Sequence, residues 1–464
     1  MFTRVCLIVA LLSALPAWAQ ANKSGTGADA NNADRLPITE QSEVVDETMA
    51  FSHAPMLIPP WLNFEPYPQA VLSETRSDYL RNYLRIGWTM TTGYSDNVSA
   101  GAETTKPVSD ISYSVWPSIA LDRTTSRMHW MLNYRPGFSF YQRTGDLNNQ
   151  QDQSLALDFQ YRLTPHLTAT LRDSLARTSN ALNQPDLLSG ETSGVAQPII
   201  IIAPVATQLT NTANAELTYN FAQDSIAGAE GTFTNLHFPN PAQVPGLYEF
   251  SSQRGSAFYS RRFYGKHYIG VTYQYSEYLA YPANPQSDTQ THTALLFYTF
   301  YATPTLSLSF SGGPQHFDVE ESSSPSLHSW IPAATASIDW RGRSTLFQAS
   351  YLRMVAGVEG LFGAFNSNTA NVLTRWQLAR TWNLGASGGY AINKNVASSL
   401  LLASPGGHSI SGTVSLQHFL TQHIRFELGY THQHQSYNDI PLISIAPSTN
   451  REFATVTYQV ARPL

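Results

Sequence analysis

Apolar and polar residues alternate with a period of two through most of the chain, from about residue 83 to the end. In one such segment Leu84, Ile86, Trp88 and Met90 alternate with arginine, glycine and threonine residues. Successive side chains of an extended strand point to opposite faces, so this period predicts strands with one apolar and one polar face. The same pattern recurs near 113–121, 155–162, 305–310, 382–390, 410–417 and 424–431.

The connections between these segments alternate in length. Eight short turns are interleaved with nine longer connections that are rich in proline, glycine, asparagine and serine. The short turns lie near 124–125, 164–166, 222–224, 264–266, 303–304, 341–343, 380–381 and 421–422. The long connections lie near 97–110, 144–151, 179–210, 238–253, 280–290, 319–330, 357–367, 394–407 and 437–450. This arrangement predicts about eighteen antiparallel strands in up-and-down order, with sixteen as the alternative, because the patterns at 226–237 and 293–301 are weak.

Sorting of connections by length distinguishes two classes of all-β protein. Transmembrane barrels of the bacterial outer membrane have short periplasmic turns, long outer loops and an even number of strands. A soluble sandwich has no reason to sort its loops in this way. We therefore expect a transmembrane antiparallel up-and-down β-barrel with an N-terminal periplasmic segment. Aromatic residues near strand ends are expected to form girdles at the two membrane interfaces, or else are ordinary strand residues: Trp88, Trp130, Trp340, Trp376, Trp382, Tyr161, Tyr301 and Tyr390.

Composition agrees with a chain that faces lipid on one side and water on the other. Only 13% of residues are charged, against about 25% in soluble domains. The mean hydropathy is nevertheless −0.22, because serine, threonine, asparagine and glutamine fill the polar positions. The formal charge of −6 argues against a nucleic-acid partner, which requires a basic surface.

The first nineteen residues have the organisation of a secretory signal peptide. Arg4 precedes an apolar stretch at 5–15, and Ala17-Trp18-Ala19 forms an A-x-A cleavage site. Cleavage would remove Cys6, the single cysteine, so the mature chain is expected to have no thiol and no disulfide. After residue 19 there is no run of about 18 apolar residues, so no transmembrane helix is expected.

Three regions are therefore expected: a signal peptide at 1–19, a flexible, proline-rich periplasmic segment at 20–82, and a barrel at 83–464. Prolines between 53 and 70 exclude a helix or a central strand there, and a short helical stretch is expected around 72–82. Aromatic residues stand between these prolines, namely Trp61, Phe64 and Tyr67. Residues 50–80 are thus expected to plug the periplasmic mouth, to dock on a periplasmic partner, or to act as a tether.

Two hairpin sequences carry a resemblance to a known class. Residues 161–168 (YRLTPHLT) and 416–424 (LQHFLTQHI) resemble hairpins of the bacterial outer-membrane, porin-like β-barrel family. Within that family the chain is similar to barrels that accompany exopolysaccharide export loci. The resemblance implies an outer-membrane barrel that contacts lipid and is inserted by the barrel assembly machinery. No catalytic motif is part of it.

Strand parity assigns a set of charged residues to the inner, polar face. The inward arginines are expected to be Arg85, Arg135, Arg162, Arg172, Arg375 and Arg425, and the inward acids Asp158, Glu216, Asp339 and Glu427. An excess of arginine favours anions in a pore, through Coulomb attraction and bidentate contacts. The alternative is that these arginines pair with the acids and brace the wall.

The connection at 179–210 is the longest and contains four consecutive β-branched residues, Ile199, Ile200, Ile201 and Ile202. Left exposed, they would form a costly apolar patch. They are expected to fold into the barrel as a constriction; the alternatives are a protruding hairpin and contact with a partner.

Chemistry-bearing residues give no catalytic or metal site. The chain has 13 histidines, and His432 and His434 share one strand face, but two ligands make a weak metal site and rim histidines are usually solvated. His418 and His423 flank a short turn, and neither an H-E-x-x-H nor a G-x-S-x-G motif is present. We expect no cofactor, no metal and no enzymatic activity.

The function expected from the sequence is porin-like passage or export of polar solutes, including anionic solutes and saccharides, across the outer membrane. The alternative is a structural or assembly component of an envelope polysaccharide export machine, with a closed lumen. An outer-membrane enzyme is the third hypothesis.

Overall fold

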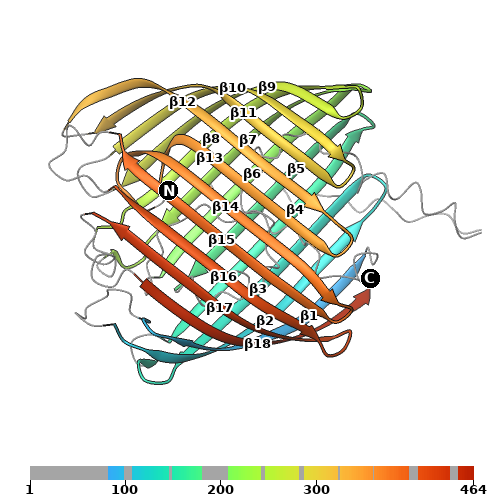
Figure 1. Ribbon diagram of the computed structural model, residues 1–464, viewed down its shortest axis with the longest axis vertical. Helices are drawn as coiled ribbons and strands as arrows, with labels where there is room; N and C mark the ends of the chain where they lie inside the picture. The colour runs from blue at the N-terminus through green and yellow to red at the C-terminus, as the bar shows by residue number, and fades with distance from the viewer. Residues whose placement is uncertain are drawn as a thin grey trace, which may run out of the picture. The chain divides into compact units, whose positions relative to one another are not determined.

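The computed structural model describes residues 82–98, 107–145, 149–179, 207–241, 246–281, 287–321, 324–358, 360–396, 406–438 and 448–464. These residues form eighteen antiparallel strands that close into one barrel (Figure 1). The strands are β1 (Tyr83–Ser95), β2 (Asp110–Thr124), β3 (Met128–Tyr141), β4 (Gln150–Thr164), β5 (Leu167–Thr178), β6 (Gln208–Ala222), β7 (Ser225–His237), β8 (Glu249–Phe263), β9 (His267–Tyr281), β10 (Ser287–Thr303), β11 (Leu306–Glu321), β12 (Ser324–Arg341), β13 (Thr345–Gly357), β14 (Ala364–Ala379), β15 (Trp382–Asn395), β16 (Gly407–Phe419), β17 (Ile424–Tyr437) and β18 (Ser448–Pro463).

Each strand pairs with its neighbours in sequence, and β18 closes the sheet by pairing with β1. The closing register runs from Tyr83 opposite Pro463 to Ser95 opposite Arg451. Pairing of β1 with both β2 and β18 satisfies the backbone groups that an edge strand would expose. The expected antiparallel barrel is confirmed, with eighteen strands rather than sixteen. The two weak patterns are strands: 226–237 lies within β7, and 293–301 lies within β10.

The short turns all lie at one end of the barrel, the end at which the C-terminus lies (Figure 1). We call this the inner end and the opposite end the outer end.

The prediction of one long connection was wrong. Instead of a loop at 319–330, β11 runs to Glu321 and β12 begins at Ser324. The strands extend because Phe317 and Val319 pack with other apolar side chains on the inner face of the barrel.

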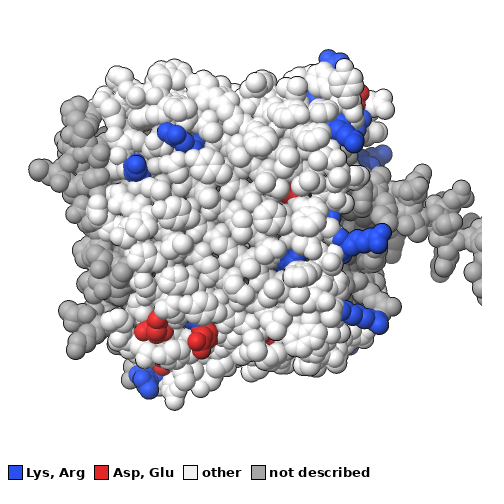
Figure 2. Space-filling view, in the orientation of Figure 1, with Lys and Arg blue, Asp and Glu red and all other residues white. Residues whose placement is uncertain are grey.

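Side chains alternate between an apolar outer face and a polar inner face, as the period of two predicts. Outward residues such as Ile86, Leu296 and Val414 are more than half exposed. The inner face carries hydroxyl pairs between neighbouring strands, such as Thr91–Thr455 at 3.0 Å and Ser114–Ser139 at 2.8 Å. The charged residues on the face shown in Figure 2 lie mostly toward its two ends. This distribution is that of a lipid-facing barrel wall.

Aromatic residues on the outer face include most of those expected in the girdles. Trp88, Trp340, Trp376, Trp382 and Tyr390 are all partly exposed there. Tyr301 was assigned wrongly. It shares the inner face with Thr299, and its ring lies 5.3 Å from that of the buried Tyr268. Phe300 takes the outward position instead, and two adjacent aromatics give the hydrophobic pattern no way to choose between the faces.

The wall is interrupted between β12 and β13. Their pairing extends only from Arg341–Leu346 to Ala334–Arg353, although β13 continues to pair with β14 as far as Gly357. Pro332 lies two residues beyond the last β12–β13 pair, and proline has no N–H to donate to a ladder. Beyond this point β13 leaves its neighbour, and this departure shapes the outer mouth.

Candidate functional site: the lumen and its outer mouth

The predicted lumen-lining residues lie on the polar face of their strands. Arg85, Arg135, Arg162, Arg172, Arg375, Arg425, Asp158 and Glu427 occupy positions in phase with the buried hydroxyl residues and out of phase with the exposed apolar ones. Their role in a conducting lumen remains a prediction.

Several of the inward arginines have partners in the wall. Nε of Arg172 lies 3.2 Å from Asp158 on the neighbouring strand, and Arg341 pairs with Asp339 at 3.1 Å. The guanidinium of Arg85 donates to the hydroxyl of Tyr83 at 2.9 Å. Arg135, Arg162, Arg375, Arg425 and Glu427 are engaged in interactions as well. Bracing of the wall, the alternative raised from the sequence, applies at least to the Arg172–Asp158 pair.

The alternation of side chains along the observed strands places further charged residues on the inner face, which the sequence analysis did not identify. The additional inward acids are Asp110, Asp122, Asp152 and Glu230, and the additional arginines are Arg254, Arg262, Arg341 and Arg451. Four further acids against four further arginines bring the named inward residues to ten arginines and eight acids, so the excess of arginine stays at two, as in the set expected from the sequence. Asp110 was missed because the pattern had assigned it to the loop at 97–110, and Asp152 because it precedes the clear alternation of its strand.

Charge is distributed unevenly around the lumen. On β6 and β7, Glu216 faces Glu230 directly. Asn214 donates to Glu230, and Thr218 donates to Glu216 at 2.9 Å. By contrast, the inward positions of β9, of β10 and of β11 as far as Val319 carry no charged side chain and are rich in serine and threonine. One arc of the wall is therefore ionic, and another offers mainly hydroxyl groups.

At the outer end, the β13–β14 hairpin folds into the lumen. Gln315, on the inner face of β11, holds the backbone of Val355 with two hydrogen bonds: its amide donates to the Val355 carbonyl at 2.9 Å, and the Val355 N–H donates back at 2.7 Å. Val355 is fully buried against Phe317 and Val319. The end of β13 therefore lies behind β11 and β12 as an inner layer.

The hairpin reaches the opposite part of the wall. A Cβ atom added to Gly357 would lie 2.7 Å from a ring carbon of Phe250 and 2.9 Å from Cβ of Tyr278. The Tyr248 N–H donates to the Gly360 carbonyl at 3.0 Å. Four strands, β9 to β12, separate β8 from β13 along the wall, and neighbouring strands lie about 4.8 Å apart. These contacts therefore cross the lumen.

An apolar cluster fills the space between the hairpin and the wall. It contains Leu236, Phe238, Leu247, Phe250, Tyr278, Val358, Leu361, Phe365 and Tyr437. Its members come from β7, β8, β9, β14, β17 and two outer connections. We call it the outer-mouth cluster. It narrows the lumen with apolar side chains at the end where the long connections lie.

The constriction predicted from the sequence involved a different connection. Ile199, Ile200, Ile201 and Ile202 lie outside the described residues, so that prediction stays open, as do those for residues 1–19 and 50–80. The inward β13–β14 hairpin was missed. Its signal was the apolar content of 355–365 (VAGVEGLFGAF) inside an expected polar loop, since exposed apolar loops are costly.

Two histidines at the outer rim form hydrogen bonds with side chains of the neighbouring strand. Nδ1 of His432 lies 2.7 Å from Asn450 Oδ1, and Nδ1 of His434 lies 2.9 Å from the Ser448 hydroxyl. At the inner end His418 stacks on Trp382 with 4.2 Å between ring centroids.

Within the described part of the chain, no group of three or more histidine, cysteine, aspartate or glutamate residues is arranged to hold a metal ion. Among the same residues, no helix is long and apolar enough to span a membrane.

Comparison with known proteins finds solved structures that are similar to this chain at low sequence identity. No protein-family model and no curated protein matches the chain. The chain is similar to the ferric citrate transporter FecA in its unliganded form, with 11% identity, a TM-score of 0.40, and coverage of 76% of this chain and 60% of FecA. It is similar to OpdK of Pseudomonas aeruginosa with vanillate, with 10% identity, a TM-score of 0.39, and coverage of 82% and 99%. OccAB4 of Acinetobacter baumannii gives the same four values.

Proposed function

We propose that this protein is an outer-membrane channel for polar solutes, with anionic solutes and saccharides among them, and that the β13–β14 hairpin gates its outer mouth. The observation that carries the proposal is a closed barrel with an apolar outer face and a polar, charged inner face. An eighteen-strand barrel is wide enough for an aqueous channel. The inner end would face the periplasm and the outer end the exterior, as in other outer-membrane barrels.

The charge of the lumen supports weak selectivity. The inward arginines outnumber the inward acids only slightly. In pairs such as Arg172–Asp158 the two opposite charges also cancel each other. The hydroxyl-rich arc of β9 to β11 offers hydrogen bonds to polyhydroxylated solutes, which suits saccharides. We expect a modest preference for anions.

A second function is favoured by the contacts across the outer mouth. If the outer-mouth cluster stays closed, the barrel acts as a structural or assembly component of an envelope polysaccharide export machine. The Tyr248–Gly360 hydrogen bond and the ring contact of Tyr248 with Phe362 at 5.4 Å support such closure. In either case we propose that outer-membrane lipid surrounds the barrel, that the barrel assembly machinery inserts it, and that residues 50–80 contact a periplasmic partner.

The two functions differ in ion conductance. The refolded mature protein would be placed in a planar bilayer under a salt gradient, after a gel has shown that it migrates as a folded, heat-modifiable barrel. The channel predicts discrete conductance steps with a small reversal potential of the anion-selective sign. Silence from a demonstrably folded barrel would contradict the channel and favour the closed component.

A further inference from the structure

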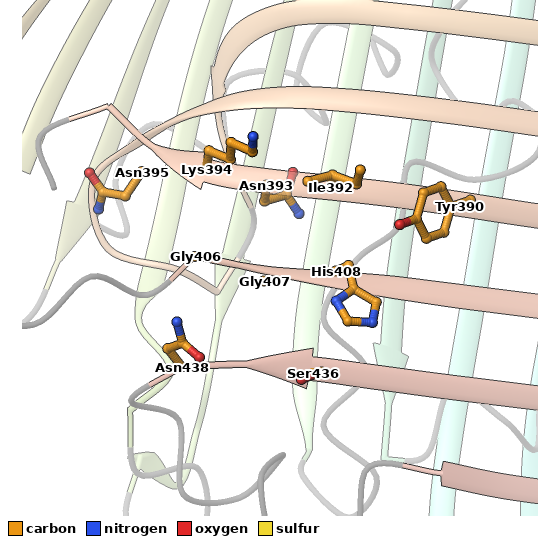
Figure 3. Close-up of a pocket in the computed structure, with 10 residues that line it drawn as sticks. All are labelled: Tyr390, Ile392, Asn393, Lys394, Asn395, Gly406, Gly407, His408, Ser436 and Asn438. Atoms are coloured by element: carbon orange, nitrogen blue, oxygen red, sulfur yellow. The ribbon is translucent and has the colours of Figure 1, made fainter.

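A cavity opens at the outer ends of β15, β16 and β17, on the outward side of the wall. Its volume is about 540 Å³, within the range of small-molecule sites. Figure 3 shows Tyr390 and Lys394 on β15, His408 on β16, and Ser436 and Asn438 at the end of β17. We call it the rim cavity.

The side chains of the rim cavity form an electropositive and hydrogen-bonding surface. Lys394 is exposed, and none of the ten lining residues is a carboxylate. Within the described residues Lys394 has no ion-pair partner. Arg353, on the same outer face two strands away, likewise forms no ion pair there. A cation without a counter-charge favours an anionic group on a ligand.

The remaining lining groups suit a sugar ring. Tyr390 is 42% exposed, and its ring centroid lies 6.4 Å from that of His408. An exposed tyrosine presents an apolar ring face together with a polar hydroxyl, which matches the C–H face and the hydroxyl groups of a pyranose. The Asn438 side chain and the Ser436 hydroxyl are exposed and supply donors and acceptors.

Close backbone packing holds these groups together. A Cβ atom on Gly407 would lie 2.2 Å from the Ser436 carbonyl oxygen. Only glycine therefore permits β16 to lie this close to β17. The Asn438 N–H donates to the Gly406 carbonyl at 3.1 Å, which ties the end of β17 to the start of β16.

We propose that the rim cavity binds a phosphorylated or otherwise anionic saccharide, with Lys394 at the anionic group and Tyr390 against the sugar ring. Such a ligand has two sources. It is a free solute at the mouth of the barrel, or it is the phosphorylated headgroup of an outer-leaflet glycolipid beside the wall. Because the cavity faces outward, the proposal does not depend on conduction through the lumen.

Lysine acetylation provides a direct test. The sequence has four lysines, and only Lys394 and Lys266 lie in the described part of the chain. Lys266 is in the β8–β9 turn at the inner end and serves as an internal reference. Folded protein in detergent would be treated with an acetylating reagent, with glucose 6-phosphate, glucose or inorganic phosphate present. The modified peptides would then be quantified by mass spectrometry.

The proposal predicts selective protection of Lys394. At glucose 6-phosphate concentrations several times Kd, its acetylation should slow about fivefold or more, because only the free site reacts. Lys266 should react at an unchanged rate, and glucose should protect weakly. Equal protection by inorganic phosphate and glucose 6-phosphate would overturn the saccharide assignment. No protection of Lys394 would overturn the site.

A tyrosine variant tests the role of the ring. Tyr390→Leu should raise the glucose 6-phosphate concentration needed for protection by up to about tenfold, while protection by inorganic phosphate stays unchanged. Tyr430→Leu is the matched control, since Tyr430 is an outward tyrosine on β17 that hydrogen-bonds to Asn450 and does not line the cavity. Equal effects of the two variants would contradict the proposed stacking.

An experiment in membranes distinguishes the two possible sources of the saccharide. Protein in phosphatidylcholine vesicles would be compared with protein in vesicles that also contain lipopolysaccharide. Protection of Lys394 by lipopolysaccharide in the membrane identifies a glycolipid headgroup, and protection by the soluble probe alone identifies a free solute. Conductance plays no part in this readout, so a silent barrel with a protected Lys394 would contradict the channel and support the rim cavity.

Discussion

The N–H of Tyr248, between β7 and β8, donates a 3.0 Å hydrogen bond to the carbonyl of Gly360, between β13 and β14. These two connections belong to parts of the wall that are separated by β9 to β12. A bond between them requires one connection to leave the wall and enter the lumen. The β13–β14 hairpin does so, and the outer-mouth cluster forms where it meets the wall.

Gly357 is predicted to control how deeply the hairpin enters. Gly357→Ala places a methyl group 2.7 Å from Phe250, which should cost about 1–3 kcal/mol through overpacking and displace the hairpin. The expected results are a lower free energy of unfolding in urea and a larger single-channel conductance. Gly255→Ala is the control, because no atom lies within 4 Å of its added Cβ. Equal conductance in the two variants would show that Gly357 does not position a gate.

Gln315 is predicted to anchor the hairpin. Gln315→Leu removes both hydrogen bonds to Val355 and leaves buried backbone groups unpaired, at a cost of about 1–3 kcal/mol. Hydrogen exchange of the Val355 amide should accelerate accordingly, by roughly tenfold or more. In Gln274→Leu, where only a bond to Ser276 on the same strand is lost, this amide should exchange as in the unmodified protein. Unchanged exchange in Gln315→Leu would contradict the anchor.

Selectivity should follow the inward charges of the ionic arc. Replacing both Glu216 and Glu230 by glutamine should shift the reversal potential toward anions, and Arg172→Gln should shift it toward cations. Each shift should change the permeability ratio by roughly twofold, as expected for the removal of one or two charges in a wide, wet lumen. Glu452→Gln is the control, because Glu452 lies on the outward face of β18. A control effect equal to the others would place selectivity outside the lumen wall.

Strand identity was predictable because it depends on local pattern. The alternation at Leu84, Ile86, Trp88 and Met90, together with the eight short turns, is enough to place the strands and their order. Tyr301 shows the limit of this reasoning, because its neighbour Phe300 is equally apolar and either could face outward.

The outer mouth was not predictable, because it depends on contacts between distant segments. The sequence marks 357–367 as a long connection, but nothing local states that Gly357 will meet Phe250 and Tyr278. Likewise, Asp152 precedes the clear alternation of β4, so its inward position follows only from the register with β3. The rim cavity draws residues from three strands and an outer connection, and no motif joins them.

Conductance of a reversibly cross-linked barrel tests the central claim most directly. Tyr248 and Phe362, whose rings lie 5.4 Å apart, would both be replaced by cysteine in the mature chain and joined by a short, reducible bis-thiosulfonate linker. The gated channel predicts conductance steps before linking, their loss or strong reduction when the linker is in place, and their return on reduction in the same bilayer. Steps of unchanged size and frequency with the linker attached would contradict the proposal that this hairpin gates the outer mouth.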